Sequence, residues 1–213
     1  MVNLNLVDLD MLKEVASIGT GNAATSLSRI VKQRISMSVP TVKMPEFKNL
    51  NSIIGGNDVL ICGLLVGISG DINGMIMYLM TEKSACTLVK EIMNRDRKSF
   101  FEFDEIDCSM ITEIGNILTS SYLTALSKLM NYKIKQSVPS LSIDMAGAIL
   151  SVPAIEFGRV ADRVLFIESK FNQTTDINKD LSGFFILVPD MESKNNTNNE
   201  EVEENNEDFV DNN

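Results

Sequence analysis

The stretch from Asp10 to Pro40, DMLKEVASIGTGNAATSLSRIVKQRISMSVP, occurs a second time in altered form from Ser109 to Pro139, SMITEIGNILTSSYLTALSKLMNYKIKQSVP. The two stretches align without a gap at an offset of 99 residues, and 11 of the 31 aligned positions are identical. Unrelated stretches of this length would share about two residues, so the repeat indicates an internal duplication.

The segments that follow the two stretches also correspond. Each contains a short helical segment and then two apolar runs typical of a β-hairpin, at 59–66 and 74–80 in the first copy and at 164–171 and 183–188 in the second. The repeated stretches themselves predict long helices over 7–32 and 103–132. We therefore predict an α+β domain with pseudo-twofold symmetry, in which the long helices pack against a mainly antiparallel β-sheet.

The two repeats, 1–95 and 96–190, are expected to form one compact domain. Residues 191–213 contain too few apolar side chains to pack and are expected to form a disordered tail. The segment 190–213 holds nine acidic residues and one Lys, which accounts for −8 of the net charge of −10. The rest of the chain is nearly neutral, so its net charge says little about a partner.

Several local features of the predicted helices can be assigned. Asp8 and Asp104 are candidate N-caps, and a further helix is expected over 81–93. Gly19 and Gly21 are expected to let the first helix approach a neighbour closely; no Lys-Ser/Thr pair follows them, so a phosphate-binding loop is disfavoured. An apolar stripe on the first helix is expected to face the sheet: Leu12, Val15, Ile18, Leu27 and Ile30.

The composition excludes several classes of function. The chain has no His, which rules out Ser-His-Asp and Cys-His catalysis and His-ligated zinc, and we predict no metal site and no cofactor of its own. It has no Trp and no aromatic-rich basic patch, so no nucleic acid is expected. Its apolar runs are too short to span a bilayer and its N-terminus lacks a signal peptide, so we expect a cytoplasmic protein without membrane insertion. Three cysteines, Cys62, Cys86 and Cys108, are expected to be reduced and mostly buried.

A polar stripe runs along each predicted long helix. In the second copy Ser109, Glu113 and Asn116 stand at i, i+4 and i+7, which places them on one helical face. The equivalent positions of the first copy are Asp10, Glu14 and Ser17. For a single stripe, a solvated helix surface is the favoured explanation. Its recurrence at registered positions weakens that explanation, although the common descent of the two copies accounts for part of the recurrence.

The stripes resemble the signature of the CheC, CheX and FliY phosphatases: Asp or Ser, three residues, Glu, two residues, Asn, 22 residues and Pro. The second copy matches throughout and ends at Pro139. The first copy matches at Asp10, Glu14 and Pro40 but has Ser17 in place of Asn. Two motifs without an added flagellar switch domain resemble the CheC branch more than the CheX or FliY branches. Pro40 and Pro139 are expected to end short strands and to have no chemical role.

The resemblance implies that the protein hydrolyses the aspartyl phosphate of the chemotaxis response regulator CheY. Asn116 would orient the attacking water, Glu113 would pair with a Lys of the regulator, and Asp10 and Ser109 would contact the regulator. The Mg²⁺ is expected on the regulator. Ser17 lacks the two-ended amide, so the site of Glu14 and Ser17 is expected to bind but to hydrolyse poorly.

The resemblance also implies binding to the receptor deamidase CheD. A helical segment near 144–150 is the candidate docking site, with Asp144, Met145 and Ala148 as its contacts, although this segment equally suits a core helix. The alternative function is a non-catalytic adaptor that binds the regulator, the deamidase or both. A flagellar switch component of the FliY type is disfavoured because no switch domain is recognised.

Overall fold

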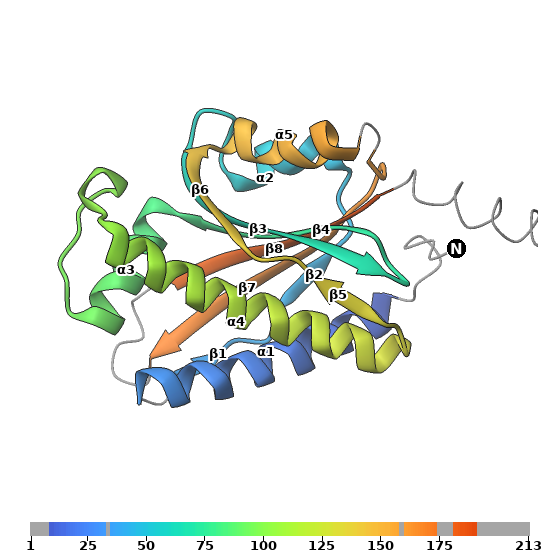
Figure 1. Ribbon diagram of the computed structural model, residues 1–213, viewed down its shortest axis with the longest axis horizontal. Helices are drawn as coiled ribbons and strands as arrows, with labels where there is room; N and C mark the ends of the chain where they lie inside the picture. Colours follow the sequence, from blue (N-terminus) through green and yellow to red (C-terminus); the bar gives the residue numbers. More distant parts are fainter. Residues whose placement is uncertain (1–8, 33–34, 158–159, 174–180, 191–213) are drawn as a thin grey trace, which may run out of the picture.

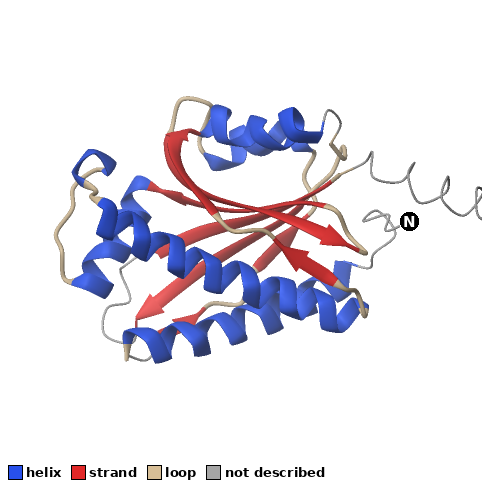
Figure 2. Cartoon of the chain, viewed as in Figure 1, coloured by secondary structure: helices blue, strands red, loops and turns tan. Residues whose placement is uncertain are grey.

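The computed structural model describes residues 9–32, 35–157, 160–173 and 181–190. These residues form three layers, with an eight-stranded sheet in the middle (Figure 1). The long helices α1 and α4 lie side by side on one face, α2 and α5 cover the other face, and α3 lies at one end (Figures 1 and 2). The elements, in chain order, are α1 (Leu9–Val31), β1 (Ile35–Met37), β2 (Thr41–Lys43), η2 (Phe47–Asn49), α2 (Leu50–Ile54), β3 (Leu60–Gly70), β4 (Gly74–Thr81), α3 (Glu82–Met93), η3 (Phe100–Glu102), α4 (Glu105–Met130), β5 (Ile134–Gln136), β6 (Ser140–Met145), α5 (Ala146–Phe157), β7 (Leu165–Gln173) and β8 (Leu181–Pro189).

Both halves of the chain contribute strands to one sheet, in which each hairpin pairs with strands of the other half. Its order is β1-β7-β8-β4-β3-β5, with β2 also paired to β7 and β6 also paired to β3, and all the pairs within this order are antiparallel. The strands that follow α1 thus complete the hairpin of the second half, and the strands that follow α4 complete the hairpin of the first. Neither half forms its part of the sheet alone.

The pairing registers of the two halves are equivalent. Thr41 of β2 lies opposite Glu168, and Ser140, which stands 99 positions after Thr41, lies opposite Leu65. At the centre of the sheet β4 pairs with β8, where Tyr78 lies opposite Phe185. The predicted fold class, long helices packed on a mainly antiparallel sheet, is confirmed. The repeat boundary between residues 95 and 96 stays a prediction, because the strands of both halves interleave.

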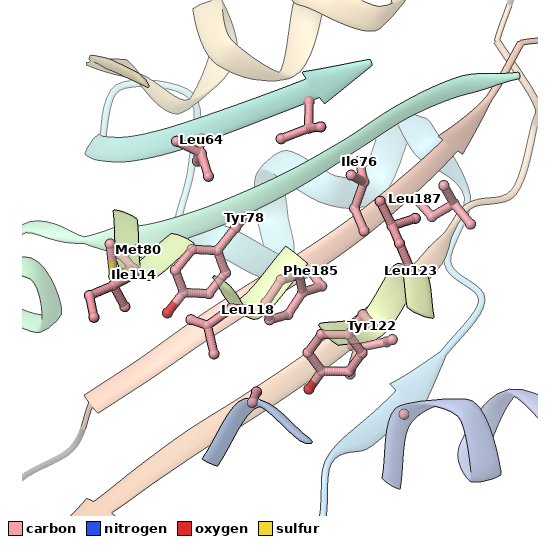
Figure 3. Close-up of a cluster of buried hydrophobic side chains, with 14 of the residues drawn as sticks. Leu64, Ile76, Tyr78, Met80, Ile114, Leu118, Tyr122, Leu123, Phe185 and Leu187 are labelled. Carbon is pink, nitrogen blue, oxygen red and sulfur yellow. The ribbon is translucent and has the colours of Figure 1, made fainter. Parts of the chain in front are cut away.

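The apolar runs of the two hairpins supply cores on both sheet faces. Successive side chains of a strand point to opposite faces, so a strand buried on both sides is continuously apolar. Along β4, Ile76, Tyr78 and Met80 face α1 and α4, while Met77 and Leu79 face α2 and α5. Figure 3 shows the first of these cores, in which the Tyr78 ring stacks on Phe185 with centroids 4.6 Å apart.

The stripe predicted on α1 is largely buried. Leu12, Val15 and Leu27 are buried in the core beneath α1 and α4, and Ile18 packs against it. The prediction for Ile30 was wrong, because this side chain lies in the last turn of α1 and is 50% exposed. The helix bounds differ from the predicted ones by one or two residues at each end.

The glycines of α1 differ in what surrounds them. A Cβ on Gly19 would lie 2.6 Å from Cδ1 and 3.1 Å from Cα of Tyr122, so the absence of a side chain lets α1 and α4 approach closely, as predicted. The prediction for Gly21 was wrong, because a Cβ there would meet nothing within 4 Å. Tyr122 in turn connects three elements, since its hydroxyl is hydrogen-bonded to those of Thr20 (2.7 Å) and Ser169 (2.6 Å).

An ionic network fixes the first turn of α4. Asp104 is the N-cap, as predicted, and forms a capping box with Asp107. Arg95 and Arg97 each bind both carboxylates, and Asp107 is fully buried. The hydrogen bond from Arg95 holds the pKa of the Asp104 carboxyl well below its usual range. The other candidate cap, Asp8, lies outside the described residues.

In the second repeat, the segment just before α5 is a strand and not the predicted helix. Asp144 and Met145 were expected to be helical but belong to strand β6, where they pair with Ile61 and Leu60 of β3. The backbone hydrogen bonds to β3 outweigh the local helical preference, and the helix begins only at Ala146.

Two further sequence predictions fall within these elements. Helix α3 occupies the predicted segment, with Thr81 as its N-cap. The three cysteines are free, with Cys62 and Cys86 buried and Cys108 half-buried. None of the helices in the described ranges combines the length and apolar character needed to cross a membrane.

Replacing Gly19 with Ala is expected to lower the free energy of unfolding by about 1–3 kcal/mol, because the new methyl group would clash with the Tyr122 backbone. Gly21→Ala is the matched control and is expected to stabilise the helix by up to about 1 kcal/mol, since its Cβ points into open space. Urea unfolding monitored by circular dichroism measures both. A Gly19→Ala protein as stable as the Gly21→Ala protein would contradict the close helix approach.

Replacing Asp104 with Asn is expected to lower the melting temperature at neutral pH. The difference in melting temperature between the variant and the wild type is expected to shrink below about pH 4. A carboxyl whose pKa is depressed in the folded protein stabilises it above the unfolded-state pKa, near 4, and loses this effect as the pH falls through the folded-state value. Asn keeps a side-chain oxygen that can cap the helix, so the difference in melting temperature reports the effect of the charge. Asp58→Asn, at an exposed turn, serves as control. A difference that persists unchanged to pH 2 would sink the charge argument.

Candidate functional site

The second polar stripe lies on the outer surface of α4. Ser109 and Glu113 are exposed, and Asn116 is half-buried one turn further on. The opposite side of the helix is buried, with Ile111, Ile114 and Leu118 in the core. The three predicted residues therefore share one accessible helix face, and the rigid helix keeps Glu113 and Asn116 within reach of the same partner group.

Two hollows flank this stripe. The first, here called the β6-side hollow, has a volume of about 530 Å³ and is lined by Cys108, Ser109, Thr112, Glu113, Leu141 and Ile143. The second, here called the interhelix groove, has a volume of about 570 Å³ and runs between α1 and α4; its lining residues are Asn22, Thr25, Ser26, Arg29, Asn116, Ile117, Ser120, Ser121, Thr124 and Lys128. Glu113 thus borders one hollow and Asn116 the other.

The carboxamide of Asn116 is not fully paired. Its Oδ1 atom is shielded from solvent and accepts no hydrogen bond from the described residues. Leaving a buried acceptor unpaired costs about 1–3 kcal/mol, so most native structures avoid it. The hydrogen bonding of the fold therefore makes no use of this acceptor, while the residue itself lines the interhelix groove.

The residues after α4 connect it to the sheet beside Asn116. The Ser120 hydroxyl donates to Oε1 of Gln136 (3.1 Å) and accepts from its Nε2 (3.0 Å), and Ser137 Oγ accepts from the Gly67 amide (2.9 Å). Pro139 lies between β5 and β6, where its lack of an N–H suits a break in the ladder. The neighbouring Val138 is 88% exposed.

The first copy presents a matching stripe on α1. Asp10, Glu14 and Ser17 are all exposed. Lys13 donates to Asp10 (2.7 Å), and this hydrogen bond lowers the pKa of the Asp10 carboxyl. Pro40 lies between β1 and β2, as Pro139 lies between β5 and β6. The structure therefore presents both predicted stripes but does not bring them together into one site.

Sequence reasoning missed the cations of the interhelix groove. Arg29 on α1 and Lys128 on α4 both line it. They stand 99 residues apart, which is the offset of the repeat. The alignment of the two copies therefore pairs a basic residue with a basic residue at this position. Asn22 of α1 lies outside the motif register, yet it lines the same groove as Asn116.

The described residues contain no group of three or more Cys, Asp or Glu side chains placed to hold a metal ion. The stripe instead offers one carboxylate and one carboxamide on a fixed spacing. These groups suit recognition of a cation and positioning of a water molecule in a partner's active site.

Two sequence comparisons find similar proteins. The model of the CheC-like family matches residues 7–44 and 106–143, two ranges that are themselves 99 positions apart. The chain is 31% identical over 189 residues to the CheY-P phosphatase CheC of Bacillus subtilis, an alignment that covers 87% of this chain and 89% of that protein.

Solved structures share the fold. Thermotoga maritima FliY has a TM-score of 0.66 at 24% identity, covering 85% of this chain and 91% of that one. The middle domain of FliM from Vibrio alginolyticus has a TM-score of 0.59 at 15% identity, covering 84% of this chain and 92% of that one. At these identities the two structures show a common fold alone.

Replacing Asn116 with Ser, the residue that α1 carries at the equivalent position, is expected to leave the melting temperature unchanged or to raise it. The substitution removes an unpaired buried oxygen that opposes folding. Leu118→Ala, on the buried side of the same helix, is the destabilising control, at about 2–5 kcal/mol. Differential scanning calorimetry compares the three proteins. A large loss of stability in Asn116→Ser would mean that the carboxamide serves the fold.

Proposed function

The chain belongs to the CheC-like family, and we propose that it hydrolyses the aspartyl phosphate of the phosphorylated response regulator CheY with Asn116 as the water-orienting residue. The accessible stripe on α4 carries this proposal, because Asn116 lies within the second range that the family model matches and keeps an unpaired acceptor. The B. subtilis relative, named as a CheY-P phosphatase, aligns over most of both chains and supports the same activity.

The reaction requires little covalent chemistry from the phosphatase. A response regulator holds its phosphoryl group on an Asp beside a bound Mg²⁺ and a Lys, so the transition-state charge is already stabilised. Water attacks phosphorus, the bond from phosphorus to the Asp oxygen breaks, and the water proton leaves with the phosphate product. The missing element is a water held in line, and the Asn116 amide supplies both a donor and an acceptor to hold it.

Glu113 fixes the register of this insertion. It is exposed one helical turn before Asn116, so its carboxylate reaches the phosphate-contacting Lys of the regulator while Asn116 enters the active site. No acid–base role is assigned to Glu113, because the departing Asp carboxylate needs no proton. Ser109, exposed one turn earlier, extends the contact along the same face.

The stripe on α1 is proposed as a second docking site of low activity. Glu14 is as accessible as Glu113, but Ser17 is shorter than Asn and lacks the amide. A water held about 1 Å from its correct place can cost about 100-fold in rate. Most of the hydrolysis is therefore assigned to Asn116.

The receptor deamidase CheD remains a proposed partner. Asp144, Met145 and Ala148 are all exposed, Met145 by 49%, and they lie where β6 runs into α5. This junction is on the sheet face opposite α1 and α4 (Figure 1), so a deamidase bound there leaves the α4 stripe accessible.

Steady-state phosphate release from CheY that is phosphorylated by a small-molecule donor tests the proposed activity. We expect the wild-type protein to accelerate release, Asn116→Ala to abolish at least 90% of the acceleration, and Ser17→Asn to raise it by up to about twofold, because a second site gains the water-orienting amide. The test uses the full chain with Mg²⁺ present.

Ser52→Ala is the control, because this exposed residue belongs to α2, which covers the sheet face opposite both stripes, and the variant is expected to keep the wild-type activity. If the wild type adds nothing to the spontaneous rate of CheY while still binding its activated form, the phosphatase assignment fails and the adaptor function replaces it.

A further inference from the structure

The interhelix groove has a cationic rim. Arg29 enters it from α1 and Lys128 from α4, and both side chains are exposed. None of the ten lining residues is acidic. In a chain of net charge −10 this is a local excess of positive charge, and it lines the same groove as Asn116.

Neither cation is neutralised within the described part of the chain. Arg95 and Arg97, by contrast, are held by two carboxylates each. No ion pair joins Arg29 or Lys128 to a described carboxylate. The guanidinium group of Arg29 and the ammonium group of Lys128 are therefore both available to an external anion. Arg in particular offers a planar set of donors that matches a carboxylate.

The remaining polar groups of the groove define what it can bind. The Thr25 hydroxyl donates to the Gly21 carbonyl (2.9 Å) and the Ser121 hydroxyl to the Ile117 carbonyl (2.7 Å), so their protons are already engaged. Ser120 is paired with Gln136. The donors left for a ligand are the two cations, the hydroxyls of Ser26 and Thr124, and the amides of Asn22 and Asn116. Because these donors include two cations and the lining has no acidic residue, they favour a negatively charged occupant.

We propose that Arg29 and Lys128 bind the acidic mouth of the phosphorylation site of the regulator and thereby hold it over Asn116. This inference rests on the proposed function. A site that binds Mg²⁺ and a phosphoryl group must carry carboxylates around the metal, so its rim is acidic and complementary to the groove. The helix of the first repeat thus contributes a docking residue to the catalytic stripe of the second.

Charge on an interface rim acts mainly on the association rate and on its dependence on salt. The test therefore measures the association rate constant of the full chain with beryllofluoride-activated CheY and Mg²⁺ by stopped-flow fluorescence, from about 20 mM to about 500 mM NaCl. The variants are Arg29→Gln, Lys128→Gln, the double variant and Arg29→Glu. Lys83→Gln, which removes an exposed charge on α3 away from the groove, is the matched control.

Each single Gln variant is expected to associate about 3- to 10-fold more slowly than the wild type at the lowest salt, with a larger loss for the double variant and for Arg29→Glu. The differences are expected to shrink towards 500 mM NaCl because salt screens exposed charges. The concentration of CheY that half-saturates phosphate release is expected to rise in these variants at the lowest salt, since the substituted residues dock the regulator.

If the groove variants associate at the rate and with the salt dependence of Lys83→Gln, the inference is wrong even where the wild type is an active phosphatase. A wild type that binds activated CheY in a groove-dependent way but releases no phosphate supports the docking surface and overturns the proposed activity instead. Thermal unfolding of each variant is expected to match the wild type, because both side chains are exposed.

Discussion

The close packing of α1 on α4 sets the geometry on which the other features depend. Gly19 lets the two helices meet at Tyr122, whose ring packs on Phe185 at a centroid distance of 4.3 Å and whose hydroxyl is bonded to Thr20 and Ser169. One side chain thus connects α1, α4, β7 and β8 through apolar contact and buried hydrogen bonds. Because these contacts fix the spacing of the helices, they also fix the groove between them and the position of Asn116 at its edge.

The two halves of the chain have similar backbones, but polar residues in the first turns of α1 and α4 have different ionic partners. The start of α4 is anchored by two arginines and a capping box around the buried Asp107. On α1 the first motif residue, Asp10, is instead engaged by Lys13 on the exposed surface. An exposed pair contributes little to stability, whereas breaking a buried pair is costly.

The described residues of the proposed interface carry positive charge, although the chain as a whole is acidic. Most of the net charge belongs to residues 190–213, whereas the groove beside Asn116 presents Arg29 and Lys128. Cations at this place suit the proposed contact with an acidic partner site, since like charges there would slow the encounter. Glu113 stands at the opposite side of the stripe, next to the β6-side hollow, so the two signs of charge face different parts of a docked regulator.

The sequence by itself determined the elements and the motif. The offset of 99 residues predicted two long helices and two hairpins, and the i, i+4, i+7 spacing placed Ser109, Glu113 and Asn116 on one face, because helical and strand periodicities are local properties of a chain. Local propensity failed at Asp144 and Met145, which pair with β3, and at Ile30, which lies beyond the core. Only the tertiary structure decided that the strands of each half complete the hairpin of the other, that Gly19 and not Gly21 meets a neighbour, and that Arg29 lies beside Asn116. Each of these depends on contacts between residues 64 to 138 positions apart, which no local pattern records.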